Sequence, residues 1–302
     1  MVVGSRAFLG LTLGCTALTG SQAAYLRLTY ASPPPAQGPH SGTEFVDSLK
    51  ATPRALSQNI SRRILVIGDS LALGVGGEGS FPGRTTGPAL PRSVAQRLSR
   101  LWGEHVGWRA IGISGGDVGV LKREILPAVQ KVKEDGEITA IVVVCGVNDW
   151  KGVTLGKTEY RFAEDLRNLV RRLRDIVGKE CAIILPAIPG VAEAPRFPNP
   201  LRSFAALLND RWDAQKEQLA NTMEKVYYVC NPETWPDDPR KYFSILDRLH
   251  PSEFGYMRWG ERIAAMIGKH VKFEPAQAET TKVETTKAEI LKPAPPPIRA
   301  LA

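Results

Sequence analysis

Short apolar runs alternate along the chain with segments in which apolar residues recur every three or four positions. The runs are short enough for strands and lie at residues 63–67, 108–112, 139–145, 181–185 and 225–229. The run TAIVVVC at residues 139–145 is apolar at consecutive positions, which is typical of a strand covered by helices on both faces. We therefore predict five buried strands.

The segments between these runs have helical periodicity. From Phe162 to Val177 the apolar residues are spaced by three and four positions, and Gly178 follows as a stop signal. Similar spacing recurs near residues 94–102, 204–212 and 256–267. Alternating strands and helices predict an α/β fold with a parallel, doubly wound three-layer sheet. In such sheets the working site lies at the carboxyl ends of the strands.

The two ends of the chain differ from this central pattern. Residues 7–26 carry no charge and follow Arg6, with small residues at Ser21 and Ala23, as in a secretory signal peptide cleaved after Ala23. The same stretch is long enough for a membrane anchor, and an organelle transit peptide is a third alternative. Residues 1–26 therefore predict a secreted or membrane-anchored protein, with organelle targeting as the alternative.

Proline and polar residues dominate two further segments. Residues 27–60 contain ASPPPAQGPHSG and are predicted to be an exposed linker. Residues 273–302 repeat ETTKV-ETTKA and end in a proline-rich stretch, so they are predicted to be a disordered tail. One enzyme-sized domain is expected over residues 61–272.

Composition excludes several classes of protein. Apolar residues make up 43% and charged residues 23%, an ordinary globular balance. The formal net charge is +8, but no long Lys/Arg run or nucleic-acid-reading motif accompanies it. The four cysteines show no C-x-x-C spacing, which argues against a metal site or a disulfide scaffold. We expect no nucleic-acid partner, no metal and no cofactor.

Polar motifs follow the predicted strands, and together they indicate acyl transfer. Ser70 ends a Gly-Asp-Ser turn after the first run, and Asp247 and His250 precede the last helix. A serine hydroxyl needs a base to take its proton, and a neutral histidine oriented by a carboxylate provides one. The oxyanion formed by the attack needs preorganised donors. Candidates are the backbone N–H groups of Ser70 and Gly115 and the side-chain amide of Asn148.

These motifs resemble those of the SGNH hydrolase (GDSL esterase/lipase) family over roughly residues 62–269. The matching blocks are GDSLALGVG, GISGG, GVND and DRLHPSEFGY. The resemblance implies a flavodoxin-like αβα sandwich and a metal-free esterase mechanism. It also implies a triad of Ser70, Asp247 and His250, with Gly115 and Asn148 as oxyanion donors. Gly116 follows Gly115 where a polar residue is usual, so the donating glycine is less sharply defined.

The substrate stays open at this level. The leading hypothesis is a serine esterase on a small or medium acyl ester, and carbohydrate O-deacetylase and lysophospholipase are alternatives within the fold. A non-catalytic binding module is a remote alternative. The loops at residues 77–87, 150–156 and 188–200 are expected to select the substrate. Asp69 and Asp149 are interpreted as acceptors that fix loops rather than as catalytic groups.

Overall fold

A single mixed sheet forms the middle layer of the molecule. The computed structural model describes residues 2–45, 62–232 and 237–271, and in it the strands lie in the order β1-β3-β2-β4-β5-β6. Only β1 runs antiparallel to its neighbour. The strands are β1 (Ser41–Glu44), β2 (Arg62–Gly68), β3 (Val106–Gly112), β4 (Ala140–Val144), β5 (Ala182–Pro186) and β6 (Val226–Val229).

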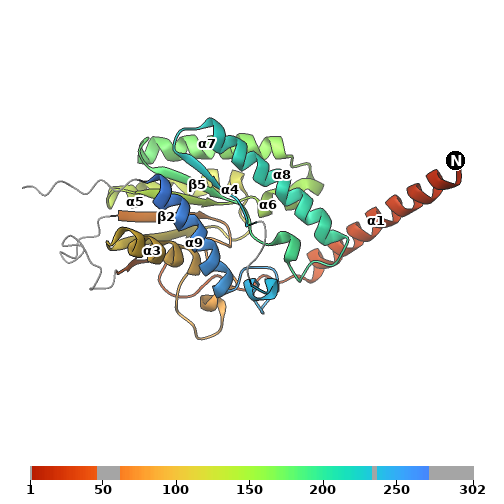
Figure 1. Cartoon of the computed structure of the whole chain (residues 1–302), viewed down its shortest axis with the longest axis horizontal. Coiled ribbons are helices and arrows are strands. Elements are labelled where there is room, and N and C mark those ends of the chain that lie inside the picture. Colours follow the sequence, from red (N-terminus) through yellow and green to blue (C-terminus); the bar gives the residue numbers. More distant parts are fainter. Residues whose placement is uncertain (1, 46–61, 233–236, 272–302) are drawn as a thin grey trace, which may run out of the picture. The chain divides into compact units, whose positions relative to one another are not determined.

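Helices cover both faces of this sheet, as Figure 1 shows. Helices α3 and α9 pack against each other on one face, and α7 packs with α4, α5 and α8 on the other. The helices are α1 (Val2–Thr29), α3 (Ala89–Trp102), α4 (Val118–Glu124), α5 (Leu126–Glu134), α6 (Val147–Trp150), α7 (Glu159–Val177), α8 (Leu201–Thr222) and α9 (Glu253–His270). Short 3-10 turns are η2 (Glu78–Ser80), η3 (Lys151–Leu155), η4 (Val191–Glu193) and η5 (Pro239–Tyr242).

Local sequence signals explain these elements. Every residue of β4 is buried, as expected for a strand between two helical layers. The Thr158 hydroxyl accepts a hydrogen bond from the Arg161 N–H and caps α7, which ends at Gly178. The α/β prediction is confirmed, because the five predicted strands are β2 to β6 and run parallel.

The sixth strand corrects the linker predicted over residues 27–60. Residues 41–44 form β1 and pair with β3, and Ala36 is buried at 3% exposure. The sequence SGTE has no strand periodicity, and Gly42 is needed because a side chain there would meet the ring of Trp108. We call residues 30–44 the N-terminal strap. Residues 46–61 and the predicted tail lie outside the described residues.

The first helix contacts the domain near its C-terminal end. The Gln22 side-chain amide donates to the carbonyl oxygen of Asn199 and accepts from the Leu201 N–H, at 2.8 and 3.1 Å. Leu26 packs against the core. None of the helices in the described part of the chain combines the length and apolarity needed to span a membrane.

Strand register brings the predicted site loops together. Gly68, the last residue of β2, pairs with Gly112 of β3 on one side and with Val144 of β4 on the other. The chain turns out of the sheet after all three strands at one edge. Ser70, Gly115 and Asn148 follow these three strands, so the register fixes where each loop starts.

Buried carboxylates then hold the loops in place. Asp149 in α6 accepts hydrogen bonds from the Val118 N–H at the start of α4, at 3.2 and 3.3 Å. Burial is the main cause that raises the pKa of Asp149 to about 7, against the effect of the Val118 hydrogen bond. This contact supports the interpretation of Asp149 as a loop-fixing acceptor.

We predict that the N-terminal strap stabilises the domain. A chain that begins at Arg62 lacks β1 and the buried Ala36, so its melting temperature should fall by about 5–10 °C. A chain that begins at Leu26 keeps the strap and should melt within about 2 °C of the full chain. Thermal unfolding followed by circular dichroism measures both, and equal melting temperatures for the two truncations would contradict a stabilising strap.

We predict a second, pH-dependent effect for Asp149→Asn. Because the folded state raises the pKa of this carboxyl from 3.8 to about 7, Asp149 lowers the free energy of unfolding as pH rises between these values. Between pH 5 and pH 8 the free energy of unfolding, measured by urea denaturation, should therefore fall by about 2–3 kcal/mol more in the wild type than in Asp149→Asn. The exposed Asp175→Asn is the matched control. An unchanged pH slope in Asp149→Asn would show that this carboxyl does not titrate as inferred.

Candidate active site

Ser70 lies in a tight loop that leaves the end of β2. The Asp69 carboxylate accepts from the Leu71 N–H at 2.9 Å, and its backbone carbonyl accepts from Ala72 at 3.1 Å. The Val75 N–H closes the turn on the Ser70 carbonyl at 3.0 Å. Asp69 is almost fully buried, and burial raises its pKa. Its hydrogen bonds assign it to loop fixation, as the sequence indicated.

Asp247 and His250 lie in a second loop that closes just before α9. The Ser244 N–H donates to the His250 carbonyl at 2.8 Å, and Phe243 forms a bridge with Pro251. This loop lies directly against the serine loop at Gly76. A side chain there would place its Cβ 2.7 Å from the Cβ of His250, and Gly76 has a positive φ of 89°.

The helix after this loop also contacts the serine loop. The buried Tyr256 hydroxyl donates to the Val75 carbonyl at 2.8 Å. Gly255 precedes it because a Cβ there would come within 2.3 Å of the Tyr242 carbonyl oxygen. Gly255 and Tyr256, the last two residues of the block DRLHPSEFGY, therefore hold the two loops together.

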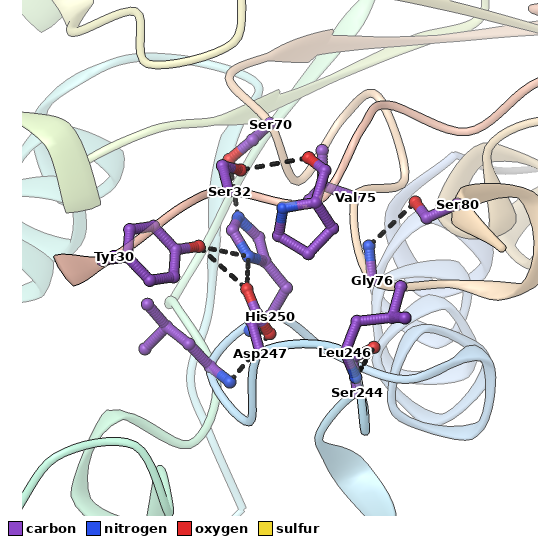
Figure 2. A network of polar contacts seen from close by, with 12 residues as sticks. Tyr30, Ser32, Ser70, Val75, Gly76, Ser80, Ser244, Leu246, Asp247 and His250 are labelled. Atoms are coloured by element: carbon purple, nitrogen blue, oxygen red, sulfur yellow. Dashed lines mark hydrogen bonds and ion pairs between the residues drawn. The ribbon is translucent and has the colours of Figure 1, made fainter.

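The structure brings Ser70, His250 and Asp247 into one hydrogen-bonded chain, shown in Figure 2. The Ser70 Oγ lies 3.0 Å from His250 Nε2, and His250 Nδ1 lies 2.6 Å from Asp247 Oδ2. An ionised carboxylate can only accept, so the imidazole proton belongs on Nδ1. Nε2 is then left to accept the Ser70 hydroxyl proton.

Asp247 is held as a carboxylate. Burial by itself would raise its pKa, but the His250 contact, the Leu249 N–H and the Tyr30 hydroxyl outweigh burial and lower the pKa to about 2. The N–H groups of Leu249 and His250 both donate to Oδ1 at 3.0 Å. Oδ2 therefore remains the oxygen that faces the imidazole.

Tyr30 is a member of this cluster that the sequence did not indicate. Its hydroxyl donates to Asp247 Oδ2 at 2.8 Å and lies 3.2 Å from His250 Nδ1. It belongs to no motif and precedes the proline-rich stretch, so no sequence signal pointed to it. Only the path of the N-terminal strap brings it to the site.

Gly115 and Asn148 lie at the ends of the neighbouring loops. Gly115 is exposed with a φ of 76°, and a side chain there would meet nothing within 4 Å. The Gly116 N–H already donates to the Ile113 carbonyl at 2.9 Å. This occupied donor favours Gly115 over Gly116 as the glycine that faces a substrate.

The Asn148 amide is anchored by its neighbours. Its Nδ2 donates to Asp69 Oδ2 and to the Gly116 carbonyl, both at 3.1 Å, and its Oδ1 accepts from Lys151 Nζ at 3.4 Å. These contacts fix which end of the amide is the donor. An oxyanion would have to share an N–H with one of these two acceptors.

A buried ion pair that the sequence analysis missed lies next to the loop that carries Asn148. Lys216 of α8 is fully buried and donates to Asp213 Oδ1 at 2.7 Å and to the Pro186 carbonyl at 3.0 Å. Its Nζ would lie 3.4 Å from a side chain at Gly146. Lys216 thereby contacts the loops that follow β4 and β5. The helical spacing of α8 gave no indication that a lysine faces inward.

An apolar cleft opens beside Ser70 and His250. Its lining comes from residues 150–151 and 188–197 but not from residues 77–87, so two of the three loops expected to select substrate contribute. The apolar lining residues are Leu71, Val147, Trp150, Ile188, Val191, Ala194, Phe197, Phe243 and Leu249.

Metal ligands do not gather elsewhere in the described part of the chain. Within residues 2–45, 62–232 and 237–271, no three His, Cys, Asp or Glu side chains are grouped so that they could hold a metal ion. Cys145 and Cys181 are buried, and burial raises the pKa of both thiols. These two cysteines are therefore poor nucleophiles.

Solved structures share this architecture. The chain is similar to the lipase Lip_vut3 from a goat rumen metagenome, with 17% identity and a TM-score of 0.52 over 70% of this chain and 100% of the other. A family 3 carbohydrate esterase from Clostridium thermocellum has 20% identity and a TM-score of 0.48, covering 69% and 97%. An acetylxylan esterase from Geobacillus stearothermophilus, as a catalytic mutant, has 19% identity and a TM-score of 0.46, covering 71% and 97%.

Sequence comparisons place the chain in a family. A search of curated proteins gave no match. The family model described as GDSL-like Lipase/Acylhydrolase matches residues 66–258, a span that holds every predicted site residue from Ser70 to His250. The chain therefore belongs to the GDSL-like lipase/acylhydrolase family, whose members are hydrolases acting on ester bonds.

Proposed function

We propose that this protein is a serine esterase that hydrolyses carboxylic esters through Ser70, His250 and Asp247. The observation that carries the proposal is the continuous chain of contacts from Ser70 Oγ through the imidazole to the Asp247 carboxylate, at 3.0 and 2.6 Å. Such a chain has a nucleophile, a base and an orienting anion in the order that acyl transfer requires.

The proposed reaction has two halves. Ser70 Oγ attacks the ester carbonyl carbon while His250 Nε2 takes the hydroxyl proton, and the resulting oxyanion collapses to an acyl-enzyme as the alcohol leaves with that proton. Water then attacks the acyl carbon, again losing a proton to Nε2, and the acid is released as Ser70 recovers its hydrogen. Asp247 stays ionised throughout and holds the imidazole proton on Nδ1.

The oxyanion is proposed to bind at the N–H groups of Ser70 and Gly115 and at the Asn148 amide. Gly115 is exposed without a neighbour in the space beside it, which leaves room for a substrate oxygen. Asn148 has its donor end fixed by Lys151 and Asp69 contacts. Donors held in place before the reaction stabilise developing charge at little reorganisation cost.

The cleft favours an apolar acyl group of small or medium size. Trp150, Ile188 and Phe197 are among the side chains that line it beside Ser70. Hydrolysis of nitrophenyl esters of increasing acyl length, beside acetylated xylan and a lysophospholipid, separates this preference from the deacetylase and lysophospholipase alternatives. We expect a maximum at an acyl chain longer than acetyl.

Replacement of the nucleophile tests the mechanism. Ser70→Ala removes the attacking oxygen, so kcat for a nitrophenyl ester should fall by at least about 10⁴-fold while the melting temperature stays within a few degrees. A fluorophosphonate should label the wild type at Ser70 and leave the variant unlabelled, as mass spectrometry would show. The exposed Ser203→Ala is the matched control outside the triad, and retained turnover in folded Ser70→Ala would remove Ser70 from the mechanism.

Replacement of Asn148 tests the oxyanion site. Asn148→Ala should lower kcat by about 10²–10³-fold with little change in KM, because a donor to the oxyanion acts mainly once charge has formed. Asn148→Asp should be worse, because a second carboxylate would face Asp69, whose Oδ2 now accepts from the amide at 3.1 Å.

The same residue also bridges two loops, so stability is measured on the same preparations. If Asn148 only held Asp69 and Gly116 in place, Asn148→Ala would melt earlier and its folded fraction would keep a normal kcat. A stable Asn148→Ala protein with unchanged kcat would exclude Asn148 as an oxyanion donor.

A further inference from the structure

Tyr30 reaches the catalytic cluster from a segment far from it in sequence. Its hydroxyl donates to Asp247 Oδ2 at 2.8 Å, the oxygen that also contacts His250 Nδ1. The same hydroxyl lies 3.2 Å from Nδ1 itself. Figure 2 shows the phenol ring directed at the edge where the imidazole and the carboxylate meet.

The N-terminal strap holds Tyr30 in this position through backbone hydrogen bonds. The Ala36 N–H donates to the Leu73 carbonyl at 3.1 Å, so the strap is bonded to the serine loop itself. The Gln37 N–H donates to Gly79 at 2.8 Å, and its carbonyl accepts from Gly87 at 2.8 Å. Beyond them β1 fixes the far end of the strap to the sheet.

Contacts on the other side of Tyr30 fix its ring. The guanidinium of Arg196 lies over the ring at 5.9 Å, and the Arg196 N–H donates to the carbonyl of Arg248 within the Asp247–His250 loop. Tyr30, the first residue of the strap, is thus held by Arg196 on one side and by the loop that carries Asp247 and His250 on the other.

We propose that Tyr30 is a positioning residue for the catalytic triad and that the N-terminal strap is therefore a structural part of the active site. The proposal rests on the proposed esterase mechanism. The Tyr30 hydroxyl contacts Asp247 and His250, and we infer that it acts on Ser70 through these two residues.

The chemistry of the hydroxyl supports this role. Burial, together with the charge of Asp247 and the hydrogen bond to it, raises the pKa of Tyr30, so the phenol stays protonated and donates. A donor on Oδ2 restricts the position of that oxygen beside the imidazole. It also takes up part of the carboxylate charge, which moderates the attraction of Asp247 for the protonated imidazole.

Other charged groups act on the same cluster. The charge of Arg196 interacts with Tyr30, the charge of Lys151 with Asp247, and the charge of Asp69 with His250. Each of them remains in a variant that lacks only the Tyr30 hydroxyl. The substitution Tyr30→Phe therefore removes the hydroxyl together with its contacts to Asp247 and His250, and it keeps the ring under Arg196.

The test compares full-length Tyr30→Phe with the wild type and with Tyr25→Phe, whose tyrosine is 65% exposed. For Tyr30→Phe we expect kcat on a nitrophenyl ester to fall about ten-fold with little change in KM, the loss of one hydrogen bond to a charged group. Tyr25→Phe should match the wild type.

A coupling measurement separates positioning from a general loss of stability. Fluorophosphonate labelling rates of Ser70 are compared in wild type, Tyr30→Phe, Asp247→Asn and the double variant. If Tyr30 acts through Asp247, Tyr30→Phe slows labelling of the wild type but barely changes the rate in the Asp247→Asn background. Equal effects in both backgrounds would overturn the proposal.

Failure of the proposal for Tyr30 can be distinguished from failure of the proposed esterase mechanism. If Ser70 of the wild type is labelled and Ser70→Ala is inactive while Tyr30→Phe behaves as wild type, the mechanism stands and the role of Tyr30 is wrong. If wild-type Ser70 is never labelled and Ser70→Ala keeps its turnover, the mechanism itself is wrong and the proposal for Tyr30 falls with it.

Discussion

The register of β2 against its two neighbours is the constraint on which the site depends. Gly68 pairs with Gly112 and with Val144, so three chain segments leave the sheet side by side. The strands β2 and β4 are buried along almost their whole length, and a slip of one residue would turn every side chain toward the opposite helical layer and break its packing there. Hydrophobic burial therefore sets, to within one residue, where Ser70 and Asn148 begin their loops.

Buried polar groups then position the loops that leave the sheet, at some cost in stability. Asp69 and Asp149 are buried carboxyls whose pKa values are raised, and Lys216 is a fully buried lysine paired with Asp213. An apolar substitute of similar size could be as stable at such positions. These groups instead hold specific backbone groups near the cleft. Asp69 accepts from the Leu71 N–H, Asp149 accepts from the Val118 N–H, and Lys216 donates to the Pro186 carbonyl. These buried groups therefore fix the backbone at several points around the cleft.

Much of this arrangement was predictable because it follows local rules. The five parallel strands follow from apolar runs, and Ser70, Asp247 and His250 were recognisable because they lie in the blocks GDSLALGVG and DRLHPSEFGY, which resemble those of the SGNH hydrolase family. The strand β1 could not be predicted, since SGTE lacks periodicity. It pairs with the edge of β3, where the missing side chain of Gly42 makes room for the Trp108 ring. The roles of Tyr30 and Lys216 could not be predicted either. Tyr30 contacts Asp247, 217 positions away, and Lys216 contacts Pro186, 30 positions away.

The sequence distances across the catalytic cluster have a consequence for how activity arises during synthesis. The Ser70–His250 contact spans 180 residues and the Tyr30–Asp247 contact spans 217. A ribosome releases the strap and the nucleophile first, and the sheet can pair strand by strand, but the base arrives only with the loop before the last helix. A nascent or C-terminally shortened chain can thus hold a well-formed sheet and still carry an inert serine.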